Sequence, residues 1–257
     1  MSASTFNLKD RLKASGIHLA ISLAIAALAA ALVFLVWYPY PYREISGGRE
    51  LFILIVTIDV ILGPLITFAV FNRAKPMREL KRDLTVVVLI QLAALGYGLW
   101  TVFVARPVLL VFEYNRFRVV HAIEIDETEL PKALPALRQM PMGGVKPLGL
   151  RAFKDGNEMA DATIAAVGGG VSLSAKPELW QPYAASAVQI KLVAKPMAVL
   201  KTKFPTNAAQ IDAAITSSGK SMDQLSWLPM VGRKSYWTVL IDAQSTLPVA
   251  YLPLDSF

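Results

Sequence analysis

One acidic residue stands alone in the middle of a long apolar run of this 257-residue chain. The run is Leu51–Phe71 and the acid is Asp59. Acids inside segments that can span a membrane usually face protein or water, and they mark functional sites. Two such acids could share a proton and hydrolyse a bond, as in aspartic proteases. The other long apolar runs, Ile17–Tyr38 and Leu84–Ala105, hold no acid, so intramembrane proteolysis is not expected.

The sequence leaves three roles open for Asp59. It could be a neutral acid that holds the helices in register, a contact for another transmembrane helix, or part of a proton or ion path. One turn further on, Pro64 follows Gly63 and lacks a backbone donor, which frees the carbonyl of Val60 and kinks the helix. A freed carbonyl within a membrane needs a partner. We expect this stretch to organise helices rather than to break bonds.

Helical rise predicts the partner of Asp59. It is the ninth residue of its run, about 12 Å from the end of the helix. In the third run, Tyr97 lies at the same depth when counted from Ala105. The Tyr97 hydroxyl, or the close backbone approach that Gly96 and Gly98 permit, is therefore the expected partner. Gln91 is expected about a turn and a half deeper.

The remaining polar motifs do not assemble a catalytic site. His18 lies at the edge of the first run, and His121 has no Ser or Cys nucleophile motif nearby. The glycines at 168–170 lack the Lys-Ser/Thr of a phosphate loop, and are expected to end a helix in a left-handed turn. We predict no enzymatic activity and no cofactor.

An acidic cluster at 124–129 could suggest a cation site. It lacks the ligand spacing and the glycine of a calcium loop. Asp126 followed by Glu129 fits a helix N-terminus instead, where acids are favoured by the helix dipole. The sequence therefore predicts no metal site here.

The elements that hold Asp59 are three predicted transmembrane helices, at residues 17–38, 51–71 and 84–105. At about 1.5 Å per residue each spans roughly 31–33 Å, which matches a hydrocarbon core of about 30 Å. The first is too long for the apolar part of a cleaved signal peptide. Only 18% of the residues are charged, against about 25% in soluble domains. We expect a membrane domain at 1–105 and a separate domain at 106–257.

Basic residues predict the orientation. Three precede the first span and five lie between the second and third, whereas the first loop has two, balanced by two acids. This distribution places the N-terminus in the cytoplasm and residues 106–257 outside. The basic residues near the helix ends, which set the orientation, account for much of the net charge of +7. The outer domain has no stripe of basic residues that would bind nucleic acid. The chain has no cysteine, which excludes thiolate metal sites.

A stripe of small residues follows one face of the first predicted helix. Its members are Gly16, Ala20, Ala24, Ala27 and Ala31. Such stripes let helices approach closely within membranes. The stripe could pack inside the bundle or face a partner helix, and the sequence leaves both open.

The outer domain has an α+β pattern. Strand signals form two hairpins, at 107–113 with 117–121 and at 237–242 with 248–252, and a further strand is expected at 145–153. Helices are predicted at 155–167, at 183–204 with a break at Pro196, and at 207–218 before Gly219. Strand pairs that flank a run of helices indicate an α+β fold.

Several segments of this chain resemble the type IV pilin accessory protein family (TfpX/TfpZ-type). The most specific are Trp37–Leu51 (WYPYPYREISGGREL), Asp59–Pro64 (DVILGP) and Gln91–Trp100 (QLAALGYGLW). Further matching segments are Pro107–Glu113, Asn115–Val120, Leu228–Arg233, Trp237–Asp242 and Val249–Asp255. Residues 140–220 match only in general pattern.

The resemblance implies a bacterial inner-membrane protein with a periplasmic domain and no enzymatic activity. Its implied role is to stabilise or present the major type IV pilin for assembly. The implied partners are that pilin, through its transmembrane helix or its exported domain, the membrane lipids and the pilus assembly machinery. Because the polar start of a pilin helix lies near the cytoplasmic face, Gln91 is expected to contact it ahead of Asp59. The alternative is a membrane-anchored sensor whose outer domain binds a ligand.

The loop after the first span offers a second contact surface. Tyr40, Tyr42 and Arg43 are of the residue types that dominate interface hot spots. Tyrosines at this position also anchor proteins at the membrane interface. The sequence does not separate these two roles.

Overall fold

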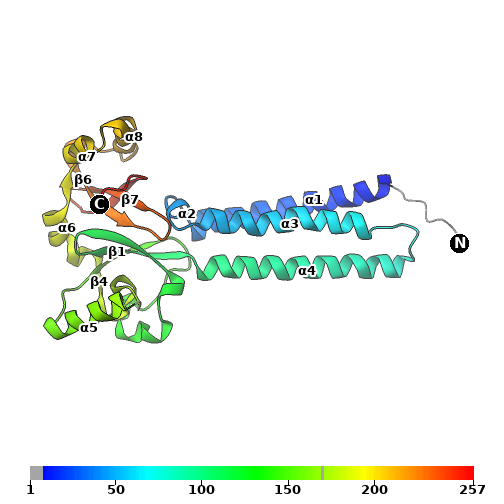
Figure 1. The fold of residues 1–257 in the computed structure, drawn as a ribbon, viewed down its shortest axis with the longest axis horizontal. Helices are drawn as coiled ribbons and strands as arrows, with labels where there is room; N and C mark the ends of the chain where they lie inside the picture. The colour runs from blue at the N-terminus through cyan, green and yellow to red at the C-terminus, as the bar shows by residue number, and fades with distance from the viewer. Residues whose placement is uncertain (1–7, 169–170) are drawn as a thin grey trace. The chain divides into compact units, whose positions relative to one another are not determined.

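Two units divide the chain in this computed structural model, which describes residues 8–168 and 171–257 (Figure 1). The first contains the residues up to Pro39 together with Gly48–Val104, and the second contains Tyr40–Gly47 together with Ala105–Phe257. This division differs in one segment from the predicted boundary at residue 105. The loop segment Tyr40–Gly47 belongs with the C-terminal domain.

Three long apolar helices form the first unit, as predicted. They are α1 (Leu8–Ala31), which continues as the π-helical turn η1 (Leu32–Trp37), α3 (Gly48–Val70) and α4 (Met77–Val104). Each is long and apolar enough to cross a membrane. Helices α1 and α4 begin before the predicted runs at 17 and 84, because Lys, Arg and Glu are good helix formers and extend a helix past its apolar part.

Helix α3 is central to this unit, since α1 and α4 each pack along it. Helix α4 packs closely on α3 at Gly98, where a Cβ atom would lie 2.7 Å from Ile55 Cγ2. At the opposite end of α1 from its N-terminus, the Tyr38 ring packs against Gly48, and its hydroxyl donates to the Val102 carbonyl at 3.1 Å. Glycines thus permit close helix packing at two levels.

The small-residue stripe of α1 faces away from α3. Its five residues, Gly16, Ala20, Ala24, Ala27 and Ala31, are all exposed within the unit. A different row of α1 is buried against the other helices, made of Ser22, Ala26, Ala29 and Val33. The first alternative, that the stripe packs inside the bundle, is therefore wrong. The second alternative, that the stripe faces a partner helix, stays a prediction.

The second unit is a mixed α/β domain built on an eight-stranded sheet. Its strand order is β4-β3-β1-β2-β6-β7-β8, and β5 pairs with β6 outside this path. The strands are β1 (Pro107–Glu113), β2 (Arg116–His121), β3 (Lys146–Leu150), β4 (Trp180–Pro182), β5 (Lys195–Pro196), β6 (Leu225–Val231), β7 (Tyr236–Asp242) and β8 (Pro248–Leu252). Pairs β1–β3 and β2–β6 are parallel and the others are antiparallel.

Both predicted hairpins and the predicted helices are present. The helices are α2 (Tyr42–Ile45), α5 (Gly156–Val167), α6 (Ala187–Val193), α7 (Met197–Lys203) and α8 (Ala208–Ser217), of which α2 was not predicted. Gly219 has φ +67°, the left-handed conformation expected after α8. Gly168, after α5, has φ −71° and is therefore not itself in the left-handed conformation. Residues 169 and 170 lie outside the described residues.

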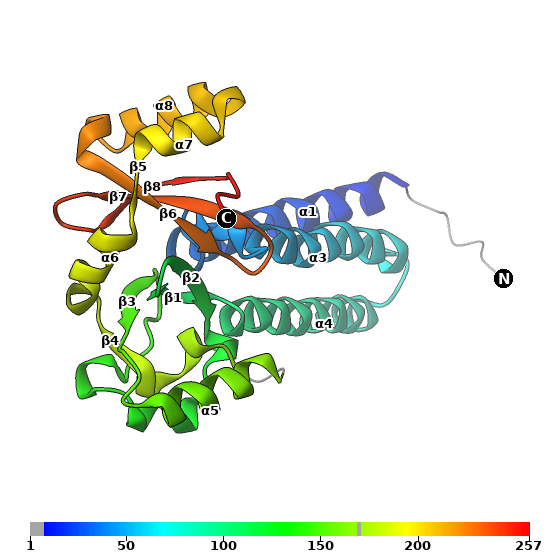
Figure 2. The ribbon, with the colours of Figure 1, turned by 60° about the vertical axis from the view of Figure 1, so that its left-hand side comes forward.

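The two faces of the sheet are covered differently. One face carries a continuous core, in which Tyr42 and Ile45 of α2 pack beside Phe112, Phe117 and other strand residues. The opposite face carries two separate cores. The first lies under short 3-10 turns, beside β1, β3 and β4, and the second lies under α7 and α8, beside β6, β7 and β8. Figure 2 shows α7 and α8 near one end of the sheet and α5 near the other.

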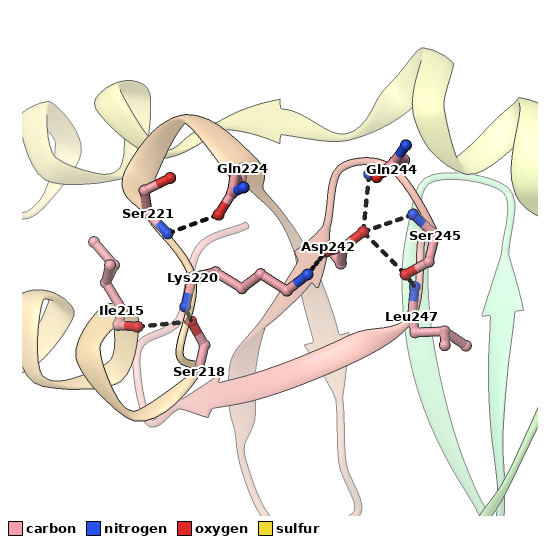
Figure 3. A network of polar contacts seen from close by, with 9 residues as sticks. All are labelled: Ile215, Ser218, Lys220, Ser221, Gln224, Asp242, Gln244, Ser245 and Leu247. Atoms are coloured by element: carbon pink, nitrogen blue, oxygen red, sulfur yellow. Dashed lines mark hydrogen bonds and ion pairs between the residues drawn. The ribbon is translucent and has the colours of Figure 1, made fainter.

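Asp242, at the end of β7, closes the turn to β8 (Figure 3). One carboxylate oxygen accepts from the backbone amides of Gln244 at 3.0 Å and Ser245 at 2.6 Å. The other forms an ion pair with Lys220, which follows α8. The Lys220 ammonium, together with the Ser245 donors, holds the pKa of the Asp242 carboxyl well below its ordinary value.

Candidate functional site

Asp59 and Gln91 form a polar pair inside the membrane helices. The Gln91 amide nitrogen donates to the Asp59 carboxylate at 3.2 Å, and lies 3.4 Å from the Asp59 carbonyl oxygen. Tyr97, the predicted partner, is 69% exposed and donates no bond to Asp59 among the described contacts. The prediction of Tyr97 is wrong, and Gln91 takes its place.

The depth of the two residues explains the difference. Asp59 is the twelfth of the 23 residues of α3, and Gln91 is the fifteenth of the 28 residues of α4. Both therefore lie at the middle of their helices, about 16–21 Å from the helix ends. Depth counted from the ends of the apolar runs placed Asp59 too near one surface, because α3 begins three residues earlier than its run.

Gly63 makes room for this pair. A Cβ atom on Gly63 would lie 1.9 Å from the Gln91 amide nitrogen and 3.1 Å from His18 Nε2. His18 belongs to α1, and its Nδ1 lies 2.5 Å from the Thr67 hydroxyl of α3. Side chains of α1 and α4 thus meet over one glycine of α3, and only a residue without a side chain fits between them.

Further polar residues of α1 bind the carbonyls of α3. The Ser15 hydroxyl donates to the Pro64 carbonyl at 2.9 Å. Arg11 Nη1 donates to the carbonyls of Phe68 at 3.0 Å and Ala69 at 2.9 Å. Sequence reasoning missed this row, although Arg11, Ser15, His18 and Ser22 recur at helical spacing of four, three and four. The row satisfies backbone acceptors that hydrocarbon cannot.

A groove of about 410 Å³ lies between α3 and α4, with Asp59 and Gln91 among its lining residues. Its other walls are mostly apolar or small: Leu51, Leu54, Ile55, Ile58, Leu62, Gly63 and Ile66 on α3, and Ile90, Ala94, Leu95, Tyr97, Gly98 and Thr101 on α4. A second hollow of about 70 Å³, between α1 and α4, also reaches Asp59 and Gln91. The polar pair is only half-buried, and it is accessible from both grooves.

The loop residues have intramolecular roles in the second unit. Tyr42 is buried, and its hydroxyl lies 3.3 Å from that of Tyr251 on β8. Burial, with Tyr251 beside it, raises the pKa of Tyr42 well above its ordinary value. Tyr40 contacts the Trp237 ring edge-to-face at 6.3 Å, and the Arg43 guanidinium lies 5.7 Å from the Tyr40 ring centre. Of the three, Tyr42 belongs to the core, whereas Tyr40 remains half exposed.

The acidic cluster of the second unit has a local structural role. Asp126 accepts from the Thr128 amide at 2.9 Å and caps the 3-10 helix Glu127–Lys132, as predicted. Glu124 accepts from His121 Nδ1 at 2.6 Å. Burial raises the pKa of Glu124, but the bond and charge of His121 outweigh it and lower the pKa overall. The described residues contain no group of three or more metal-ligating side chains.

Comparison with known proteins relates the chain to pilus assembly. Two fimbrial assembly proteins of Dichelobacter nodosus, of serogroups I and E1, are 37% and 36% identical over 247 residues, covering 95% of each chain. A third, of serogroups C1 and C2, is 46% identical over 121 residues, which is 47% of this chain and 92% of that protein. No solved structure matches the chain.

The family model of the fimbrial assembly protein FimB matches residues 6–47. This match ends where α3 begins. It therefore includes the Tyr40–Gly47 segment, which belongs to the second unit. The near full-length relatives extend the relationship over both units. The chain therefore belongs to the type IV pilus accessory family of fimbrial assembly proteins.

Proposed function

We propose that this protein binds the pilin subunit within the membrane, and that the groove between α3 and α4 receives the pilin transmembrane helix. Bound there, the pilin would be stabilised or presented for assembly. The observation that carries the proposal is the half-buried Asp59–Gln91 pair in a groove whose other walls are mostly apolar. We assign the protein to the inner membrane, with its second unit in the periplasm, on its membership of the pilus assembly family. The distribution of basic residues supports the orientation with the N-terminus in the cytoplasm.

The groove has the length and the lining for a helix. It extends along α3 from Leu51 to Ile66, which is about 22 Å by helical rise. Its small residues, among them Gly63, Ala94 and Gly98, permit close approach of a second backbone. A lipid acyl chain could pack against the apolar walls of the groove, but it has no hydrogen-bonding group for Asp59 or Gln91.

The polar pair favours a helix over lipid. A carboxyl group has several acceptor positions, and the Gln91 amide uses one oxygen of Asp59. A partner helix with a hydroxyl, amide or amine at mid-membrane depth would bind the remaining positions. This replaces a site near the cytoplasmic face: since Gln91 lies at the middle of α4, the pilin residue that meets it would also lie at mid-depth.

We infer that the protein acts without catalysis. Asp59 bonds to an amide and His18 to a hydroxyl, and both contacts join helices to one another. The domain outside the membrane helices would add contacts to the exported part of the pilin. A sensor role would instead require a ligand-dependent change transmitted to the other side of the membrane.

Filling the groove tests this function. Ala93 and Ala94 are adjacent exposed residues of α4, and only Ala94 lines the groove. Tagged full-length protein is purified in mild detergent from host membranes, and the co-purified pilin is quantified. Ala94→Phe should abolish co-purification while Ala93→Phe preserves it. Equal pilin recovery with both variants would refute the groove as the binding site, and absence of pilin with the unchanged protein would refute the function.

A further inference from the structure

A pocket lies at the centre of the sheet in the second unit, between the two cores of one face. It has a volume of about 400 Å³ and is lined by Arg116, Arg118, Val231, Tyr236, Asp255 and Phe257. Strands β2 and β6 pair over only two residue pairs, Phe117 with Met230 and Arg118 with Val231. The pocket therefore occupies the junction between two halves of the sheet.

The strand register shows why no core residues cover the sheet at the β2–β6 junction. Arg118 pairs with Val111 and Val231, and Val231 pairs with Tyr236. These residues share one face of the sheet, since paired residues project to the same side. On that face one core involves β1, β3 and β4, and the other β6, β7 and β8. Neither includes the two arginines.

The arginines retain unused hydrogen-bond donors. Their Nε atoms are buried and have no partner at hydrogen-bond geometry among the described residues, although Arg116 Nε is ion-paired with Glu113. The nearest carboxylates lie at 3.5 Å, from Glu113 to Arg116, and at 3.7 Å, from Glu124 to Arg118. A charge-assisted bond is about 2.7–2.9 Å. Glu113 and Glu124 are instead engaged by shorter bonds from other residues.

The other walls restrict the class of ligand. Tyr236 and Phe257 are each 52% exposed, and their rings meet edge-to-face at 5.4 Å. They form an apolar wall beside the guanidinium groups. Asp255 adds a negative charge, as do Glu113 and Glu124 nearby. These acids repel a doubly charged phosphate more strongly than a singly charged carboxylate, which guanidinium groups can bind.

We propose that this pocket binds an acidic side chain of a partner protein, together with an adjacent aromatic residue. The carboxylate would bind Arg116 and Arg118, the aromatic ring would pack on Tyr236 and Phe257, and Asp255 would accept from a backbone amide. Arg and Tyr are residues that dominate binding energy at protein interfaces. This site lies outside the membrane helices, and it goes beyond the groove proposed for the pilin helix.

Calorimetry on the full-length protein in detergent tests the site. The probes are the peptides N-acetyl-Phe-Glu amide and N-acetyl-Phe-Gln amide, which differ in one charge. We expect the Glu peptide to bind at least about ten-fold more tightly, as the loss of a charged hydrogen bond requires. Arg118→Gln should remove this preference, whereas Arg138→Gln, a charge-matched control outside the pocket, should retain it.

Three results would overturn the proposal. They are equal binding of the two peptides, an unchanged preference in folded Arg118→Gln, and displacement of the Glu peptide by inorganic phosphate at lower concentration than by acetate. If Arg118→Gln lowers the thermal unfolding midpoint strongly, Tyr236→Ala at the exposed rim replaces it. That variant should weaken both peptides by a similar factor, and unchanged binding would contradict the aromatic wall.

Discussion

The Gln91 amide nitrogen lies 3.2 Å from a carboxylate oxygen of Asp59, and the two residues occupy the middle of adjacent membrane helices. The contact joins α3 to α4 at the side of a mostly apolar groove. It gives the lone acid of the apolar run a structural partner, and it leaves part of the carboxyl open to the groove. Stability and the proposed pilin binding would therefore depend on the same pair, and substitutions can separate them.

Asp59→Asn should be tolerated better than Gln91→Leu. Asparagine keeps a carbonyl oxygen for the Gln91 amide, so its free energy of unfolding should change by less than about 0.5 kcal/mol. Gln91→Leu removes the donor and should cost about 0.6–2 kcal/mol, the range of hydrogen bonds between membrane helices. Unfolding by SDS in mixed micelles measures both. Equal costs would show that the charge of Asp59, rather than its acceptor, holds the helices.

Gly63→Ala should destabilise the membrane helices, and Gly96→Ala should not. A Cβ atom at Gly63 meets Gln91 at 1.9 Å, whereas one at Gly96 has nothing within 4 Å. Displacement of Gln91 breaks its bond to Asp59 and overpacks the interface, at about 1–3 kcal/mol. At Gly96 alanine should stabilise the helix by up to about 1 kcal/mol. The same SDS titration checks both, and a tolerated Gly63→Ala would contradict the packing.

Ile45→Ala should destabilise the second unit. Ile45 lies between the membrane helices in sequence, but it is completely buried in the domain core. A Cβ atom on Gly232 would lie 2.1 Å from Ile45 Cγ1, which reflects how closely the segment packs. Truncation of a buried isoleucine costs about 2–5 kcal/mol. Thermal unfolding of the full chain, followed by tryptophan fluorescence, should show the loss.

Arg43→Ala is the matched control for Ile45→Ala, since Arg43 lies two residues away and its side chain is 41% exposed. It should change the unfolding midpoint little, because exposed substitutions are usually within about 0.5 kcal/mol. If both variants unfold like the unchanged protein, the Tyr40–Gly47 segment does not belong to the domain core.

Asp242→Asn should destabilise the domain at neutral pH and lose its effect in acid. The Lys220 ammonium and the Ser245 donors lower the folded-state pKa of Asp242 (Figure 3). Its contribution is therefore complete above the unfolded pKa of about 3.9 and is lost as pH falls toward the folded value. Unfolding midpoints of the variant and the unchanged protein should converge below about pH 4.

Lys220→Gln provides the comparison for Asp242. It removes the strongest cause of the lowered pKa but keeps the bonds from Ser245. Its difference from the unchanged protein should also shrink in acid, and it should be smaller than that of Asp242→Asn at pH 7. A difference that is constant from pH 7 to pH 3 would contradict the ionic role of Asp242.

Local patterns predicted most elements of both units. The three apolar helices follow from length and composition, and the hairpins β1–β2 and β7–β8 follow from alternation around short turns. Strand β6 was missed because its residues do not alternate between apolar and polar, and because it contains Pro229, which argues against a central strand. Its pairing with β2 is parallel and distant in sequence, so no local signal records it.

The candidate sites were only partly predictable. Asp59, Gly63 and Gln91 stood out by residue type, but their contacts depend on where α3 and α4 begin and end. Tyr42 looked like an interface residue, because the sequence does not reveal that its loop folds into another unit. Arg116 and Arg118 alternate with the buried Phe117, which predicts one polar face, but the pocket exists only through the order of the strands.

Disulfide cross-linking to pilin tests the central claim most directly, since the chain has no cysteine of its own. Leu62 and Ile61 are adjacent on α3 and similarly exposed, at 49% and 51%, but only Leu62 lines the groove. Each is replaced by cysteine in membranes that contain pilin with single cysteines along its transmembrane helix. We expect strong cross-links from Leu62→Cys near the middle of the pilin helix, and weak ones from Ile61→Cys. Equal cross-linking from both positions, or preference for Ile61→Cys, would contradict this expectation.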